Sequence, residues 1–267
     1  MSAPVTAASV TADLVAEQDQ LDAIVAPLDA NAWELATPSP GWAVRDQIGH
    51  LAYFDRTAAL AIADTEAFLA HRDELMAAAM SGASDDLTLA ESRAMSAPEL
   101  LAHWRDGRRA LADAAATVTD ETRVEWYGPS MSSKSFLTAR LMEAWAHGQD
   151  IVDTVDVGRS ATGRLRHIAQ LGYITRGWTY ANRGLDVPEG DVRVELTSPD
   201  GEAWAWGPEE GADATVTGTA LDFCLVTSQR RHLDDTGLVV SGELARDWLT
   251  KAQLFAGPPS DPPAPRT

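Results

Sequence analysis

Residues 40–51 read Pro-Gly-Trp-Ala-Val-Arg-Asp-Gln-Ile-Gly-His-Leu, and residues 143–150 read Glu-Ala-Trp-Ala-His-Gly-Gln-Asp. The first stretch leaves a turn rich in proline and glycine and enters a helix, with His50 about two turns along it. The second stretch lies inside a helical apolar pattern, and it carries Glu143 and His147 four residues apart. Side chains with that spacing share one face of a helix, so their tips are neighbours.

Around these two stretches, the first 155 or so residues show little strand pattern. Apolar residues recur there at helical spacing, and segments rich in glycine, proline and serine separate the helical patterns. We expect helices at about residues 11–28, 44–80 with a break, 96–111 and 132–155, with connections at 38–42, 81–86 and 127–130. That organisation predicts an antiparallel four-helix bundle.

The rest of the chain combines strand and helix patterns. Residues 191–197 alternate apolar and polar side chains, and the turn Ser-Pro-Asp-Gly at 198–201 leads into a second strand at 202–206, which predicts a hairpin. Further elements are expected as strands at 215–217 and 238–241 and helices at 164–182, 220–229 and 243–255. The fold class is therefore α+β, with expected domains 1–157 (helical bundle) and 158–256 (smaller α+β domain) and a disordered proline-rich tail at 257–267.

Composition narrows the classes of partner. The 267 residues are 45% hydrophobic and 23% charged, which is ordinary for a globular protein and excludes a largely disordered one. The 21 basic and 40 acidic side chains give a formal net charge of −19, which repels nucleic-acid phosphates and anionic membranes, so we expect neither as a partner. With no signal-peptide pattern and no long apolar run, we expect a cytoplasmic protein, as a monomer or a homodimer.

The pair Glu143 and His147 has two interpretations. Taken alone, an acid and an imidazole at this spacing most often form a hydrogen bond that stabilises the helix. The alternative is a pair of metal ligands, which needs a third ligand from another segment. His50 is the candidate third ligand, and the neighbouring Gly49 leaves room for another helix to approach closely.

The two quoted stretches together resemble the DinB-like superfamily. They are most similar to the metal-binding N-terminal domain of the mycothiol-dependent maleylpyruvate isomerase family, over about residues 10–157. The resemblance implies a four-helix bundle in which His50, Glu143 and His147 hold a divalent metal, usually Zn²⁺, with open coordination positions. Three protein ligands and an exchangeable water are typical of a catalytic zinc site.

The resemblance also implies a reaction type. Mycothiol, a low-molecular-weight thiol, would be the cosubstrate of a thiol S-transferase or a thiol-dependent isomerase acting on a small electrophile. A thiol bound to such a metal becomes a thiolate near neutral pH, so the protein needs no cysteine nucleophile of its own. The single cysteine, Cys224, lies in an apolar run and is expected to be buried. The alternatives are a non-catalytic metal-binding or small-molecule-binding protein and a metal-assisted hydrolase.

Three further residues are candidates for substrate chemistry. Arg230 and Arg231 belong to the densest basic cluster of this acidic chain, and a guanidinium group matches the geometry of a carboxylate. The same arginines would equally offset the dipole at a helix C-terminus. The resemblance implies that one C-terminal arginine reaches the active site, and Arg230 or Arg231 is our choice. Asp150, one turn beyond His147, is expected to orient an imidazole.

Overall fold

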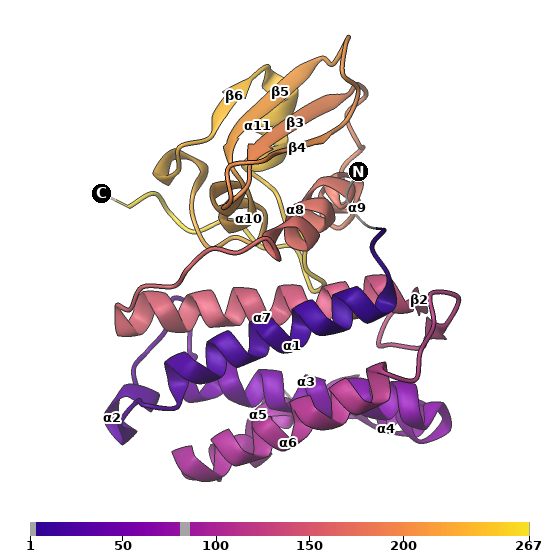
Figure 1. Ribbon diagram of the computed structural model, residues 1–267, viewed down its shortest axis with the longest axis vertical. Coiled ribbons are helices and arrows are strands. Elements are labelled where there is room, and N and C mark those ends of the chain that lie inside the picture. Colours follow the sequence, from indigo (N-terminus) through magenta and orange to yellow (C-terminus); the bar gives the residue numbers. More distant parts are fainter. Residues whose placement is uncertain (1–3, 81–85, 267) are drawn as a thin grey trace. The chain divides into compact units, whose positions relative to one another are not determined.

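A computed structural model describes residues 4–80 and 86–266 of the chain (Figure 1). The chain divides into two compact units, Met1–Gly158 and Arg159–Thr267. The first unit is helical and the second contains a mixed β-sheet, so the predicted α+β fold class is confirmed. Within the described ranges, the helices are too short or too polar to cross a lipid bilayer. The connection expected at residues 81–86 lies largely outside the described residues.

Four long helices form the bundle of the first unit. Helix α1 packs mainly against α7 and α3 against α6, while α3 also contacts α7 (Figure 1). These helices are α1 (Ala7–Val25), α3 (Val44–Ala63), α6 (Ala97–Ala115) and α7 (Ser133–Val155). The shorter elements of this unit are α2 (Ala30–Trp33), α4 (Thr65–Met80), α5 (Asp86–Arg93), β1 (Arg123–Val124) and β2 (Met131–Ser132). The predicted break in the second helix falls between α3 and α4, at Asp64.

Polar side chains cap the start of two of the long helices. The Ser132 hydroxyl accepts a hydrogen bond from the Ser135 backbone N–H at 3.2 Å, so α7 begins where its first free N–H groups find a partner. At the start of α6, the Glu99 carboxylate accepts from the Ser96 backbone N–H at 2.8 Å, and Pro98 occupies the first turn. These local signals set where α6 and α7 begin along the chain.

Helix α5 was not expected from the sequence, although Gly49 predicted that another helix packs closely against this part of α3. A Cβ atom added at Gly49 would lie 2.8 Å from the Ser92 Cβ, closer than packed atoms allow. Glycine at this position therefore lets α5 pack directly on α3, one residue before His50.

One buried carboxylate connects all four long helices. Asp55 on α3 accepts hydrogen bonds from Gln18 Nε2 on α1 at 2.9 Å and from Trp104 Nε1 on α6 at 3.3 Å. Arg140 on α7 donates to the other oxygen of Asp55 through Nη2 at 2.9 Å and Nε at 3.3 Å. Burial raises the pKa of Asp55, and the Arg140 guanidinium opposes that shift. We call Asp55 and its three partners the Asp55 hub; it fixes the register between the helices.

The second unit is built on a four-stranded sheet in the order β4-β3-β5-β6. Strand β3 pairs antiparallel with β4, as the predicted hairpin requires, and parallel with β5, which pairs antiparallel with β6. The strands are β3 (Val192–Thr197), β4 (Ala203–Trp206), β5 (Ala214–Thr219) and β6 (Val239–Ser241). The helices are α8 (Leu165–Ile174), α9 (Arg176–Ala181), α10 (Ala220–Thr227), the 3₁₀ turn η1 (Leu233–Asp235) and α11 (Glu243–Leu249).

Two predictions for this unit were wrong in detail. The single helix expected at residues 164–182 is interrupted at Thr175, and the last helix ends at Leu249 instead of continuing to 255. Residues 257–266 contain no helix or strand, and the disorder expected for this tail stays a prediction. Ser260 Oγ donates to Gln229 at 2.7 Å, and Asp261 pairs with Arg183 at 3.0 Å, so side-chain partners hold this part of the tail.

Candidate metal centre

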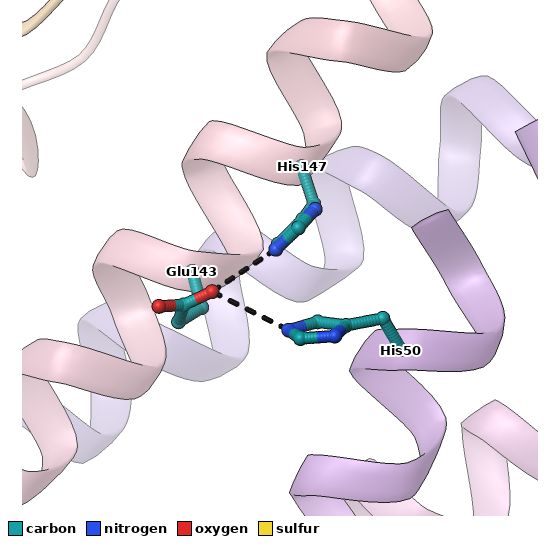
Figure 2. A group of neighbouring side chains, drawn as sticks. All are labelled: His50, Glu143 and His147. Atoms are coloured by element: carbon teal, nitrogen blue, oxygen red, sulfur yellow. Dashed lines mark hydrogen bonds and ion pairs between the residues drawn. The ribbon is translucent and has the colours of Figure 1, made fainter. Parts of the chain in front are cut away.

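The three predicted metal ligands lie together in the first unit. His50 comes from α3, and Glu143 and His147 come from α7 (Figure 2). One carboxylate oxygen of Glu143, Oε2, lies 3.0 Å from His147 Nε2 and 3.5 Å from His50 Nε2. One ligand atom from each residue lies within 4.8 Å of the other two. Packing of α3 against α7 therefore adds the imidazole of His50 to the pair that the helical spacing already provides.

The donor atoms fit a divalent metal. Two imidazole nitrogens and one carboxylate oxygen facing a common point form a ligand set that zinc and similar ions accept. The side chains of His50, Glu143 and His147 remain 18%, 24% and 11% exposed. The cluster is therefore half-buried and is not sealed from solvent.

The charges of two ligands also suit metal binding. Burial, with a contribution from the nearby His147, lowers the pKa of His50 to about 4, so this imidazole is neutral at pH 7. Burial raises the pKa of Glu143, but the imidazoles of His147 and His50 beside its carboxylate outweigh that effect and hold the pKa well below its usual range. A neutral imidazole and an ionised carboxylate are the forms that bind a metal ion.

Aromatic rings frame the two histidines. The ring of Trp42 is nearly parallel to that of His147, with centroids 5.8 Å apart and an interplanar angle of 17°. Phe54, one turn beyond His50 on α3, lies 4.6 Å from the His50 ring. These contacts restrict rotation of both imidazoles and place apolar surface beside the cluster.

A tight turn positions Trp42. The Thr37 backbone N–H donates to the Trp42 carbonyl oxygen at 2.8 Å, and the Trp42 N–H donates to the Ser39 carbonyl at 3.1 Å. Gly41 has a φ angle of +79°, in the left-handed region that glycine adopts without strain. The proline- and glycine-rich segment predicted to be a simple connection thus carries a side chain of the site.

Sequence reasoning missed Gln47, which contacts His147 directly. Gln47 Oε1 lies 2.5 Å from His147 Nδ1, and Gln47 Nε2 donates to the Thr37 hydroxyl at 2.8 Å. The signal was available, because Gln47 is a polar residue one turn before His50 on the apolar face of α3. Asp150 had been expected to orient an imidazole. Gln47 and Glu143 face the two nitrogens of His147, and Asp150 accepts a hydrogen bond from Ser39 Oγ at 3.0 Å. The role of Asp150 at the site stays a prediction.

The other predicted residues belong to the second unit. Arg230 and Arg231 follow α10, where Nη1 of Arg230 donates to the Ser228 carbonyl at 2.7 Å and Nη1 of Arg231 to the Arg230 carbonyl at 2.6 Å. Their role at the metal centre stays a prediction. Cys224 is fully buried inside α10 as predicted, and burial raises its thiol pKa, so it is not a reactive nucleophile.

The fold and the site define a class: a helical bundle with a His-Glu-His cluster between two of its helices, followed by an α+β unit. Comparison with known proteins agrees with this class. Residues 14–152 match the family model described as the mycothiol maleylpyruvate isomerase N-terminal domain. The chain belongs to this family.

Two kinds of similar protein were found: curated proteins with a similar sequence and solved structures with a similar fold. Two curated proteins, from two strains of Mycobacterium tuberculosis, are each 47% identical over 251 residues, covering 93% of this chain and 95% of the relative; both are described as uncharacterized. Two crystal structures of the mycothiol-dependent maleylpyruvate isomerase, one of a histidine-to-alanine mutant, align with a TM-score of 0.55. They are 18% and 17% identical and cover 89% of this chain and 93% of that chain, so they show a shared fold.

Proposed function

We propose that this protein is a metal-dependent enzyme, with Zn²⁺ as the first candidate metal, that uses mycothiol as its nucleophile. It would act as a thiol S-transferase or a thiol-dependent isomerase on a small electrophile. The observation that carries the proposal is the half-buried set of three donors from His50, Glu143 and His147.

The number and exposure of the ligands favour catalysis over a purely structural role. A structural zinc site closes its fourth position with a protein ligand, whereas a catalytic site keeps that position for water or substrate. In the described part of the chain, the cluster contains three ligand residues, and their side chains keep some solvent exposure. A divalent metal bound there lowers the pKa of a coordinated thiol and so supplies a thiolate near neutral pH.

The chain's own residues orient the ligands and exclude other nucleophiles. Trp42 and Phe54 hold the imidazoles of His147 and His50 and limit water beside them. Cys224, the single cysteine, is buried and protonated at neutral pH, so the reacting sulfur would have to come from a cosubstrate. This is consistent with a small thiol as the second molecule in the reaction.

We assign Arg230 and Arg231 to substrate binding and Asp150 to a polar supporting role. A carboxylate-bearing substrate would be repelled by a chain of net charge −19 unless local cations reverse the field. The two arginines supply such cations on consecutive residues. Their replacement by alanine should raise the KM for an anionic substrate more than it changes kcat.

Metal analysis combined with thermal unfolding tests the proposal. Wild-type protein should contain one equivalent of metal, and mycothiol should raise its Tm in step with ligand saturation. At a hundred times Kd, mycothiol should add about 2.7 kcal/mol to the free energy of unfolding. S-methylated mycothiol, which has no free thiol, should give a much smaller shift. His147→Ala should lose both the metal and the mycothiol-dependent shift.

Two other results would point elsewhere. Stoichiometric metal without a mycothiol-dependent shift would favour a non-catalytic metal-binding protein. Full metal content in His147→Ala would contradict the ligand assignment itself.

A further inference from the structure

We infer that Gln47 is a positioning residue, which selects the tautomer and orientation of His147 through a hydrogen-bond relay that begins in the turn at residues 37–42. The inference rests on the proposed metal binding by His50, Glu143 and His147. It adds a role for two residues, Gln47 and Thr37, that lie outside the ligand set.

The relay begins at a group that only accepts hydrogen bonds. The Trp42 carbonyl oxygen accepts from the Thr37 hydroxyl at 2.9 Å, and this contact takes the single hydrogen of that hydroxyl. The Thr37 oxygen then faces Gln47 with lone pairs only. The amide NH₂ group of Gln47 donates to it at 2.8 Å.

This contact determines which end of the Gln47 amide faces the histidine. With its NH₂ group on Thr37, Gln47 presents its carbonyl oxygen to His147 Nδ1 at 2.5 Å, so Nδ1 carries a hydrogen. In a neutral imidazole the other nitrogen, Nε2, then has the free lone pair. Nε2 faces Oε2 of Glu143 at 3.0 Å, so in this tautomer two lone pairs meet there, a contact that a bound cation would stabilise (Figure 2).

The surroundings give the relay few alternatives. The Gln47 side chain is completely buried, and the Trp42 ring stacks on the His147 ring. The turn that carries Trp42 also supplies Thr37. One short segment therefore positions both the ring that stacks on the imidazole and the hydroxyl that orients the Gln47 amide. Removing the acceptor at position 47 would leave Nδ1–H buried without its partner, and lost partners of this kind typically weaken metal binding about 10- to 100-fold.

Paired variants separate this role from general packing. Zn²⁺ affinity is measured by competition with a chromophoric chelator, and Tm is measured on the metal-free protein. Gln47→Leu should weaken Zn²⁺ binding at least about tenfold, whereas Gln47→Glu, which still accepts a hydrogen bond from Nδ1, should restore most of the affinity. Thr37→Val should weaken binding severalfold and Thr37→Ser should not, because serine retains the hydroxyl. In the Gln47→Leu background, Thr37→Val should have no further effect.

The outcomes distinguish this inference from the proposed function. Tight Zn²⁺ binding by wild type with equal affinity in Gln47→Leu would overturn the relay and leave the metal site intact. Equal weakening by Gln47→Glu and Gln47→Leu would also overturn it, since the acceptor would not matter. Failure of wild type to bind Zn²⁺ would remove the proposed function and the relay with it. If Gln47→Leu does not fold, the Thr37→Val and Thr37→Ser pair decides.

Discussion

Two carboxylates lie where α3 meets α7, and their environments are opposite. The Asp55 side chain is 1% exposed and accepts hydrogen bonds from Arg140, Gln18 and Trp104. Glu143 is 24% exposed and faces two imidazoles through one oxygen. The charge of Asp55 is balanced by Arg140 within the protein, whereas Glu143 lies beside two imidazole nitrogens that are candidate ligands of the same metal ion. The same helix pair therefore holds one carboxylate that is neutralised within the protein and another that is a candidate metal ligand.

The chemistry of the partners explains the difference. Arg140 is permanently charged, so Asp55 has its counter-ion in the folded protein without any ligand. His50 is neutral at pH 7 because burial lowers its pKa to about 4, so it gives Glu143 a ligand neighbour and no counter-charge. A divalent cation would supply the missing charge.

The largest effect is expected for Asp55→Asn. The amide leaves the Arg140 charge buried without a counter-ion, and we expect a loss of about 3–5 kcal/mol in the free energy of unfolding. Urea unfolding of the metal-free protein measures it. Glu143→Gln is the matched control, because it makes the same chemical change at the more exposed carboxylate and should cost under about 1 kcal/mol. Equal losses in the two variants would show that the sites do not differ as described.

The stabilisation by bound metal should respond to the two substitutions in the opposite order, with the larger loss in Glu143→Gln. For wild-type protein, Zn²⁺ at a hundred times Kd should add about 2.7 kcal/mol to the free energy of unfolding, and a chelator should remove it. Asp55→Asn should keep this metal-dependent gain, measured as a difference in Tm with and without chelator, whereas Glu143→Gln should lose it. A metal-dependent gain retained in Glu143→Gln would mean that the ion binds elsewhere.

A smaller effect is expected at a carboxylate between these extremes. Asp22 on α1 accepts hydrogen bonds from Arg105 and Arg108 on α6, and the Arg105 hydrogen bonds hold its pKa below the usual value. Its contribution is therefore complete above the unfolded pKa, near 4, and is lost as the pH falls through the folded value. Asp22→Asn should cost about 1 kcal/mol at pH 7, and the difference from wild type in urea unfolding should shrink towards about pH 2. A pH-independent difference would assign the loss to packing.

Local sequence signals predicted the candidate metal ligands better than the buried residues that fix the helices carrying them. The spacing of Glu143 and His147 is a property of one helix, and the resemblance of residues 40–51 to a known family added His50. Asp55 and Arg140 are 85 residues apart, and their contact depends on the register between α3 and α7, which no local pattern encodes.

The remaining errors have similar causes. Arg105 on α6 pairs with Asp22 on α1, and a contact between two helices that are far apart in the sequence leaves no local pattern. Helix α5 is short, and it is fixed by packing against Gly49 more than by a periodic apolar pattern of its own. The break at Thr175 separates α8 from α9 within a segment whose apolar pattern continues through it.

The most direct test is to load the site with Co²⁺, a spectroscopic substitute for Zn²⁺, and titrate the protein with mycothiol. If the metal at His50, Glu143 and His147 binds the cosubstrate sulfur, a sulfur-to-cobalt charge-transfer absorption should appear and saturate at one thiol per cobalt. S-methylated mycothiol should produce no such band. Stoichiometric Co²⁺ binding with a spectrum unchanged by excess mycothiol would contradict a thiol-activating metal centre.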